Sequence, residues 1–427
     1  MGENHGKPHA IMISVPYQGH INPFVNLALN IASKGFSITF VHLEFVHHKL
    51  SKAHHSSSTT VVDFFSEARE SGLDIRYTTI RDGYPLEFDR DLHFLEYVNS
   101  LYHDFPARVD EFVGNVIQSD PHSVHFLVAD TIYNWPATIA RKYNLVNVSF
   151  WTEPALVFSL GYHWDLLREN GHVPCKDDKE VDINYLPGVE SISTRDVMSY
   201  LREEEIIVSE VLFWAFQEVK KADFILHNTV QELESETLSG LNKYLPNYAI
   251  GPINFSKILD TNTISKSLWP ESDCTEWLDS KAPGSVLYVS FGSLVRTSIV
   301  SPGDANVLPA GYQDKVRDKG LVISWCDQIK VLSNPAVGGF LTHNGWNSTV
   351  ESMWCGVPMI CYPITYDQLT NRKLVADTWK IGVSLCDGTS TVERNEVAEK
   401  IRRFMDGTAL EGLKKRQKRL RGRYMMH

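Results

Sequence analysis

Residues 337–351 read V-G-G-F-L-T-H-N-G-W-N-S-T-V-E, and this stretch decides the fold class. A strand pattern ends near Thr342, a glycine follows at Gly345, and a helix pattern begins near Asn347 and Ser348. A strand that passes through a glycine turn into a helix is the building unit of α/β proteins with parallel sheets. The stretch therefore predicts one such unit with a tight turn at its centre.

The same alternation of strands and helices runs through both halves of the sequence. In the N-terminal half, strand patterns occupy residues 10–15, 37–43, 124–129 and 146–150, and helix patterns occupy residues 23–33 and 135–142. In the C-terminal half, further strand patterns occupy residues 286–293, 320–324 and 357–362. This alternation predicts a parallel, doubly wound sheet in each half.

The first strand–helix unit of the chain has its own turn signals. Residues 16–22 contain glycine and proline and predict a loop, with Pro23 in the first turn of the helix and Gly35 just past its end. His20 lies in this loop, and Asp130 ends a later strand. Both are therefore expected at the carboxyl edge of the sheet, where α/β proteins bind their ligands.

The length of the chain and one break in its pattern indicate two domains. At 427 residues, the sequence is too long for one ordinary hydrophobic core. The alternation stops around Gly251 and Pro252, and residues 254–270 are polar and without periodicity, as in an interdomain linker. We therefore expect two Rossmann-like domains that face a cleft. The N-terminal domain, the linker and the C-terminal domain are assigned to residues 1–250, 251–270 and 271–427.

Charge and cysteine content exclude several classes of function. The net charge of −11 argues against a nucleic-acid or anionic-membrane partner, and the basic run at residues 414–419 reads as a solvated helix face. No apolar segment approaches the ~18 residues of a membrane span, and the first residues lack a secretory signal. The six cysteines form no C-x-x-C pair, as in reduced intracellular thiols. We therefore expect a cytoplasmic monomer with no membrane span and no nucleic-acid partner.

The turn at Gly345 is chemically suited to an anion. The N–H groups and the dipole at a helix start favour negative charge, and a glycine lets the backbone approach a phosphate closely. His343, Asn347 and Ser348 can add side-chain donors. Glu351 lies four residues beyond Asn347, on the same helix face, where it can accept hydrogen bonds from a ribose diol. The alternative is a common strand–glycine–helix turn in which Asn347 and Ser348 only cap the helix.

Two flanking motifs favour a nucleotide site over that alternative. W-C-D-Q at residues 325–328 supplies a tryptophan ring on which a base can stack, and D-Q follows at residues 367–368. Together, residues 325–368 resemble the signature box of plant family 1 UDP-glycosyltransferases. Further motifs extend the resemblance over nearly the whole chain: P-Y-Q-G-H-I-N-P at 16–23, V-A-D at 128–130, W-T-E-P-A-L at 151–156 and F-G-S at 291–293.

The resemblance implies a GT-B fold, in which the second of two Rossmann-like domains holds most of the nucleotide sugar. It implies that uracil stacks on Trp325, with Cys326 and Gln328 at its edge. Glu351 is implied to bind the ribose. The residues implied to hold the diphosphate are Ser293, His343, Gly345, Asn347 and Ser348. The residues implied to contact the sugar are Trp346, Asp367 and Gln368. The last of these positions is a glutamine, Gln368, and in this the chain resembles the members of the family that prefer glucose.

The Q-G-H-I-N-P motif places His20 where the family has its catalytic histidine. An imidazole changes protonation near neutral pH and can therefore take a proton from an acceptor hydroxyl. A buried Asp130 bonded to the far ring nitrogen would fix the tautomer, as in hydrolase triads. As a lone residue, Asp130 could instead cap the helix at residues 135–142. The resemblance implies a single displacement with inversion, with UDP-glucose as co-substrate and with neither a cofactor nor a metal.

Two motifs suggest a metal ion, and each has a simpler explanation. Asp89, Arg90 and Asp91 match the short D-x-D pattern of metal-dependent glycosyltransferases, but this tripeptide falls among the acceptor-side loops of the family. The histidines of residues 42–55 follow no ligand spacing and predict a solvated segment. The sequence therefore predicts no metal site.

The second half departs from the family between Ser293 and Trp325. Relatives place a helix and a strand there, before an L-P-x-G-[FY] stretch that is residues 308–312 in this chain, whereas residues 296–304 are loop-like. A parallel crossover needs a dozen or more residues, and residues 309–318 can supply one short helix for it. We therefore predict that the second sheet has lost a helix–strand unit and leaves a neighbouring strand edge unpaired.

The sequence departs from the family at two further places. We expect the chain to stop short of a final helix of the family, and Asn344 replaces a common cysteine, which we expect to matter little.

The leading hypothesis is an active UDP-glucose transferase of plant specialised metabolism, acting on a small hydroxylated or carboxylated acceptor. A non-catalytic nucleotide-sugar binder or impaired splice form is the alternative that the missing unit favours. An NAD-dependent oxidoreductase is disfavoured, because no G-x-G-x-x-G follows the first strand of either half.

Overall fold

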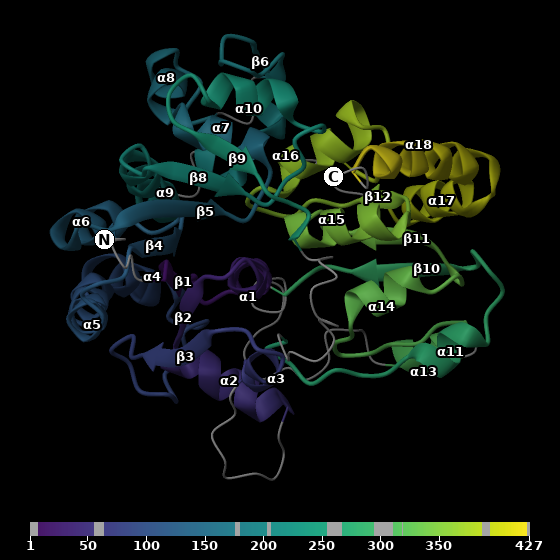
Figure 1. Cartoon of the computed structure of the whole chain (residues 1–427). Coiled ribbons are helices and arrows are strands. Elements are labelled where there is room, and N and C mark those ends of the chain that lie inside the picture. The colour runs from purple at the N-terminus through teal and green to yellow at the C-terminus, as the bar shows by residue number, and fades with distance from the viewer. Residues whose placement is uncertain are drawn as a thin grey trace. The chain divides into compact units, whose positions relative to one another are not determined.

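The computed structural model describes residues 7–54, 64–175, 180–202, 206–253, 267–293, 311–317, 319–386 and 393–424. The chain forms two compact units, which Figure 1 shows in one view. The first unit comprises Met1–Asp178, Asp182–Ile192 and Tyr200–Trp269. The second comprises Lys179–Val181, Ser193–Ser199 and Pro270–His427. Each unit is an α/β structure around a parallel sheet, as the alternation of patterns predicted.

The first unit contains a seven-stranded sheet with the strand order β3-β2-β1-β4-β5-β8-β9. All neighbouring strands are parallel. The strands are β1 (His9–Ile13), β2 (Ser37–Leu43), β3 (Ile75–Ile80), β4 (His125–Asp130), β5 (Val146–Trp151), β8 (Phe224–His227) and β9 (Asn247–Ala249). The order of the strands reverses between β1 and β4. In open α/β sheets, ligands bind beyond the carboxyl ends of the strands at such a switch point.

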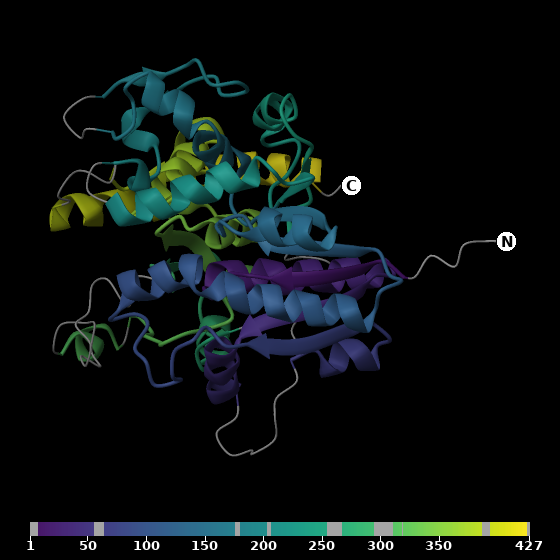
Figure 2. The same ribbon diagram turned by 90° about the vertical axis from the view of Figure 1, so that its left-hand side faces the viewer.

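Helices pack along this sheet, and Figure 2 shows strands and helices of the first unit running side by side. The longer helices are α1 (Gln18–Ser33), α2 (Glu44–His54), α4 (Phe94–His103), α5 (Phe105–Ser119), α6 (Pro136–Tyr143), α7 (Ala155–Tyr162) and α9 (Ile206–Val219). Helix α1 contacts β1 and β2, α5 contacts β3, and α6 contacts β4 and β5. Strands β1 and β2 are buried along their whole length, as expected for strands covered on both faces.

The loop predicted at residues 16–22 is confirmed for Pro16 and Tyr17 and wrong for the rest, because α1 already begins at Gln18. The N–H groups of His20 and Ile21 both donate to the carbonyl of Tyr17 at 2.9 Å, so the first turn closes before the proline. Pro23 is therefore an interior residue of α1 and not part of its first turn. Pro23 has no N–H to donate to the carbonyl of Gly19, and its side chain is buried like that of Phe24.

The second unit contains a four-stranded parallel sheet with the order β10-β11-β12-β13. The strands are β10 (Val286–Ser290), β11 (Val337–Thr342), β12 (Met359–Cys361) and β13 (Gly382–Ser384). The helices are α11 (Thr275–Asp279), α13 (Tyr312–Val316), α14 (Gln328–Ser333), α15 (Trp346–Cys355), α16 (Gln368–Lys373), α17 (Arg394–Met405) and α18 (Thr408–Tyr424). The short helix expected within residues 309–318 is therefore confirmed as α13. The loop-like residues 296–304 and most of the predicted linker lie outside the described residues.

The strand predicted at residues 320–324 is wrong. This segment has no regular structure, and the side chains of Leu321 and Val322 are 44% and 40% exposed. Among the described residues, β10 pairs with β11 alone. An apolar run becomes a strand only where a neighbouring strand can pair with it, and the helix–strand unit predicted to be missing would have supplied that neighbour.

Two segments of the predicted N-terminal domain, Lys179–Val181 and Ser193–Ser199, belong to the second unit. The longer of them, Ser193–Ser199, is held there by contacts with residues of the C-terminal half. Within this segment, the carboxylate of Asp196 pairs with the guanidinium of Arg372 in α16, and both side chains are buried. Ser199 accepts a hydrogen bond from the N–H of Tyr366 at 2.8 Å. No helix of the described residues is long and apolar enough to cross a membrane.

Candidate functional site

The first unit brings together the two residues predicted to move a proton. His20 lies in the first turn of α1, directly after β1, and Asp130 is the last residue of β4. Because β1 and β4 are parallel neighbours, both residues lie at the carboxyl edge, where the strand order reverses. Nδ1 of His20 is 2.8 Å from Oδ2 of Asp130, and the side chain of Asp130 is only 1% exposed.

Backbone groups hold the carboxylate of Asp130 in place. Its Oδ1 accepts from the N–H of Ile132 at 3.2 Å, and its Oδ2 accepts from the N–H of Val15 at 3.4 Å. Since a carboxylate can only accept, Nδ1 of His20 carries the hydrogen and Nε2 keeps its lone pair. The alternative role for Asp130 is wrong, because the residue at the start of α6 is Trp135 and makes no side-chain cap.

Three residues around this pair were not predicted. Thr152, the first residue after β5, places Oγ1 3.1 Å from Nδ1 of His20. Tyr102 and Tyr133 are buried nearby, and each hydroxyl donates to a backbone carbonyl. Burial, and after it the charge of Asp130, raises the pKa of both phenols well above the ordinary value, so both stay protonated. Two signals could have indicated Thr152: its position at the end of a neighbouring strand and its place in the W-T-E-P-A-L motif.

In the second unit, the turn between β11 and α15 has the predicted strand–glycine–helix form. Asn344 is fully buried and adopts a left-handed backbone with φ of 65°, which asparagine tolerates better than most residues. Gly345 precedes α15 and makes no side-chain cap, while its carbonyl accepts from the N–H of Thr349 at 3.0 Å. The residue at the N-cap position of α15 therefore has no side chain that would cover the start of the helix. This is the arrangement that favours an anion.

The imidazole of His343 fills the centre of this turn. A Cβ atom added to Gly292 or to Gly345 would lie 2.4 Å from its Nε2, so the ring fits only because both positions are glycine. Burial lowers the pKa of His343 to about 4, and the ring is therefore neutral near pH 7. The neutral ring carries no positive charge, which leaves His343 the hydrogen-bond donor role that the sequence predicted.

The residues predicted to bind the base, the diphosphate and the ribose are joined by one glutamine. Nε2 of Gln328 donates to Oε2 of Glu351 at 2.7 Å and to Oγ of Ser348 at 2.9 Å. Its Oε1 accepts from the hydroxyl of Tyr288 at 3.4 Å, and that hydroxyl lies 3.5 Å from Sγ of Cys326. Burial raises the pKa of the Cys326 thiol to about 11, so the thiol stays protonated. Tyr288, in the middle of β10, was not predicted, because a strand tyrosine reads as core.

A second network connects the D-Q motif to the turn. Nδ2 of Asn371 donates to the carboxylate of Asp367 and, at 2.8 Å, to the carbonyl of Asn344. Oε1 of Gln368 accepts from two backbone N–H groups, at 2.8 and 3.0 Å. Trp346 is buried, with its ring 6.1 Å from that of Trp379. The first turn of α15 therefore begins with a tryptophan whose ring belongs to the core. Its predicted contact with the sugar stays a prediction.

The remaining predicted residues lie at the margins of the described segments. Ser293 directly follows Gly292 and is half-buried. Trp325 is also half-buried, and its carbonyl accepts from the N–H of Ser272 at 2.8 Å. Their predicted contacts with the diphosphate and the base stay predictions.

Neither of the metal-like motifs in the sequence forms a cation site in the described structure. Oδ1 of Asp89 accepts from the N–H groups of Asp91 and Leu92, and Arg90 is buried in a two-pronged pair with Asp82, at 2.7 and 3.1 Å. The D-x-D tripeptide is therefore a structural turn. The solvated segment predicted at residues 42–55 is wrong in part. His42 is buried in β2 and, like His47, lies within hydrogen-bonding distance of the hydroxyl of Tyr77.

Comparison with known proteins shows the family of this chain. A family model described as UDP-glucoronosyl and UDP-glucosyl transferase matches residues 310–407. The chain is 48% identical over 433 residues to UDP-glycosyltransferase 86A1 of Arabidopsis thaliana, and the match covers 94% of this chain and 87% of that protein. It is 33% identical over 456 residues to 7-deoxyloganetin glucosyltransferase of Catharanthus roseus, over 96% and 90% of the two chains.

Solved structures show the fold. The structure of Phytolacca americana UGT2, complexed with UDP-2fluoro-glucose and pterostilbene, superposes with a TM-score of 0.75 at 23% identity. The superposition covers 98% of this chain and 94% of that one. The GT-B fold that the sequence predicted is confirmed.

Proposed function

Because this chain belongs to the plant family 1 UDP-glycosyltransferases, we propose that it transfers glucose from UDP-glucose to a small-molecule acceptor, with inversion at the anomeric carbon. The acceptor presents a hydroxyl or carboxyl oxygen. The observation that carries the proposal is the pair of His20 and Asp130, joined at 2.8 Å on the carboxyl edge of the first sheet. A relative of similar fold was solved with the phenol pterostilbene, and phenols are therefore the first acceptors to try.

In the proposed reaction, His20 is the general base. Its Nδ1–H donates to Asp130, which leaves the Nε2 lone pair to accept a proton from the acceptor hydroxyl. The acceptor oxygen forms a bond to the anomeric carbon while the bond from that carbon to the UDP oxygen breaks. The electron pair of the broken bond leaves with UDP. Asp130 stabilises the imidazolium that forms, and the buried phenols of Tyr102 and Tyr133 do not compete for the proton.

The donor is proposed to bind the second unit at the turn before α15. The first-turn N–H groups and the neutral His343 would donate to the diphosphate, which stabilises the charge that develops on UDP. Gln328 holds Ser348 and Glu351 together, so the groups proposed for phosphate and ribose are preorganised as one hydrogen-bonded set. Trp325 would stack on uracil, and Gln368 favours glucose as the sugar.

We further propose that the protein works in the cytoplasm as a monomer, without a cofactor and without a catalytic metal. All six cysteines are free, as expected in a reducing compartment. The donor turn offers N–H groups and a neutral ring to the phosphates, which supports a scheme that needs no cation there.

One assay tests the catalytic claim. The purified chain is incubated with UDP-glucose and a library of phenols, and UDP release is measured beside the variants His20→Ala and His103→Ala. We expect release by the wild type, a rate at least ~100-fold lower in His20→Ala, and no change in His103→Ala, whose side chain is exposed at the end of α4. A thermal shift with UDP tests binding separately. A wild type that UDP stabilises but that releases none would establish the alternative, a non-catalytic nucleotide-sugar binder.

A further inference from the structure

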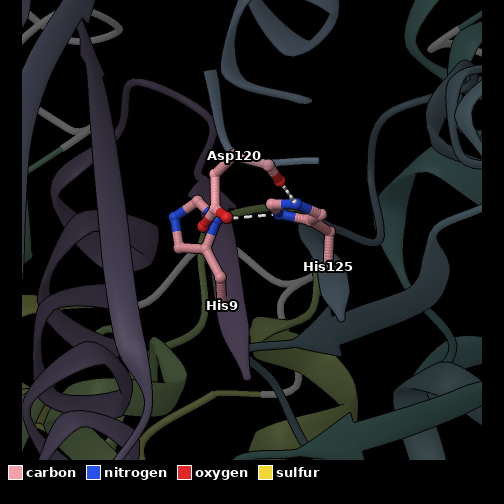
Figure 3. Close-up of side chains that lie close together, drawn as sticks. All are labelled: His9, Asp120 and His125. Carbon is pink, nitrogen blue, oxygen red and sulfur yellow. Dashed lines mark hydrogen bonds between the residues drawn. The ribbon is translucent and has the colours of Figure 1, made fainter. Parts of the chain in front are cut away.

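Two histidines face each other at the opposite edge of the first sheet from His20. His9 is the first residue of β1 and His125 is the first residue of β4, and the two are register partners in these parallel strands. Their side chains therefore leave the sheet on the same face. Figure 3 shows both imidazoles together with Asp120, which directly follows α5. Both histidines are buried, and Asp120 is half-buried.

The hydrogen bonds of the two rings leave their Nδ1 atoms pointing at one another. The Nδ1 atoms of His9 and His125 are 2.9 Å apart. Nε2 of His125 lies 2.7 Å from the carbonyl oxygen of Asp120, and Nε2 of His9 lies 2.8 Å from Oγ1 of Thr39. A carbonyl only accepts, so Nε2 of His125 carries a hydrogen, and Nδ1 of the neutral ring has a free lone pair.

This arrangement is the one that metal sites use. A histidine that binds a metal with one nitrogen usually donates the other to a carbonyl, a carboxylate or water, and this outer partner fixes the ring. His125 has such a partner on Nε2, the carbonyl of Asp120, and the Thr39 hydroxyl lies at Nε2 of His9. One ligand atom from each of His9, Asp120 and His125 lies within 4.8 Å of the others. We propose that His9, Asp120 and His125 bind a divalent transition-metal ion, with two imidazole nitrogens and one carboxylate oxygen as ligands.

The separation of the two nitrogens, which is set here by their hydrogen bond, determines which ion would fit with the least movement of the rings. Nitrogens 2.9 Å apart that each lie ~2.05 Å from an ion subtend an angle of about 90° at it. That angle belongs to the tetragonal N,O sites of Ni²⁺ and Cu²⁺. A tetrahedral Zn²⁺ site would require the nitrogens to separate to about 3.3 Å. Water would complete the coordination beside the half-buried Asp120.

Binding needs no net loss of a proton. Without metal, Nδ1–H of His9 donates to Nδ1 of His125, and Nε2 of His9 accepts from the hydroxyl of Thr39. When the ion binds both Nδ1 atoms, the proton of His9 moves to Nε2, and the Thr39 hydroxyl turns from donor to acceptor.

The site is remote from the proposed sugar transfer. His125 and Asp130 are at opposite ends of β4, and five residue steps of ~3.3 Å place them about 16 Å apart. An ion bound there would connect β1, β4 and the end of α5. Its effect is therefore on the stability of the first unit and not on the chemistry at His20.

The proposal is tested with Ni²⁺ as the probe, because Ni²⁺ suits the 90° angle and does not oxidise the free cysteines. The untagged full-length chain is stripped with a chelator and titrated by calorimetry, and its melting temperature is measured with and without Ni²⁺. We expect uptake of one equivalent with a rise in melting temperature. His125→Gln should lose that equivalent, Asp120→Asn should bind at least tenfold more weakly, and the surface control His93→Gln should bind as the wild type does.

Asp120→Asn keeps the test decisive if a buried histidine variant fails to fold. This residue is half-buried, and the variant keeps the backbone carbonyl that orients His125. A wild type that takes up no Ni²⁺ equivalent would overturn the proposal, and so would equal affinities in the wild type and Asp120→Asn. In either case the two histidines would be only a hydrogen-bonded structural pair.

Discussion

Gly292 and Gly345 are needed for different reasons, although both make room for the ring of His343. Gly292 has φ of 78°, so another residue there would be strained and would also collide with the imidazole. Gly345 has φ of −56°, which any residue adopts, so only the collision forbids a side chain. Gly345 is therefore the position at which crowding of His343 can be tested without backbone strain.

Gly345→Ala should displace the ring of His343 and disturb the start of α15. We expect the Kd for UDP to rise at least about tenfold, because overpacking a filled site costs about 1–3 kcal/mol. Isothermal titration with UDP measures the change. Gly284→Ala is the matched control, since Gly284 has φ of 72° but no neighbour nearer than 3.9 Å. It should lose about 1 kcal/mol of stability and keep its UDP affinity. Equal UDP affinities in Gly345→Ala and the wild type would contradict the role given to His343.

The sequence predicted the residues of the candidate site whose signals are local, and it missed those whose roles depend on packing. His20 and Asp130 follow strands, and the turn at Gly345 has its own sequence pattern. Tyr288 and Asn371 carry no such signal, since a strand tyrosine and a helix asparagine look structural until the fold joins them to Gln328 and Asp367. The meeting of His9 with His125 depends on strand order and register alone.

At the scale of elements, α16 is anchored by a buried charge. Arg372 in α16 pairs with Asp196, and both side chains are less than a tenth exposed. The same guanidinium also reaches Asp377 at 3.1 Å, which is half-exposed. A buried pair is costly to break from one side, because the remaining charge loses its partner without gaining water.

Asp196→Asn should therefore lower the free energy of unfolding by about 3 kcal/mol, because it leaves Arg372 without its buried counter-charge. Asp377→Asn removes the exposed partner of the same arginine and should cost at most about 1 kcal/mol. Urea unfolding of the two variants beside the wild type measures both values. If both variants lost the same free energy of unfolding, the burial of Asp196 would not determine how much its ion pair with Arg372 contributes to stability.

The elements themselves show when sequence patterns suffice. β2 and β11 have the predicted bounds, because each is a run that its neighbours bury completely. The run at residues 320–324 is as apolar but forms no strand. Its state depends on a pairing partner that the local sequence does not contain. The predicted start of α1 is too late, because Pro23 is typical of the first turn of a helix. The helix begins earlier because the N–H groups of His20 and Ile21 donate to the carbonyl of Tyr17.

At the scale of the whole molecule, buried neutral histidines make stability depend on pH. Burial lowers the pKa of His42 to about 3 and the pKa values of His227 and His343 to about 4, from 6.5 in the unfolded chain. Between these values the unfolded state binds more protons than the folded state. The free energy of unfolding should therefore fall as the pH drops below 6.5, by about 1.4 kcal/mol per pH unit for each such histidine.

His227→Gln tests this dependence at one site. Nε2 of His227 lies 2.7 Å from Oδ1 of Asn247, and a glutamine amide can replace that hydrogen bond without titrating. Urea unfolding between about pH 7 and pH 5 should show a shallower loss of stability in this variant, by roughly 1 kcal/mol per pH unit. His93→Gln, at a half-exposed surface position, should keep the slope of the wild type. A slope unchanged in His227→Gln would contradict the assignment.

The position of Ser193–Ser199 in the sequence has a consequence for recombination between related genes. Its residues are encoded far upstream of Pro270, yet they complete the fold of the second unit. A gene exchange that joins two relatives near residue 270 would pair Arg372 from one parent with the residue at position 196 from the other. Such hybrids are expected to survive only when both parents carry a compatible pair. The two positions should therefore be inherited together.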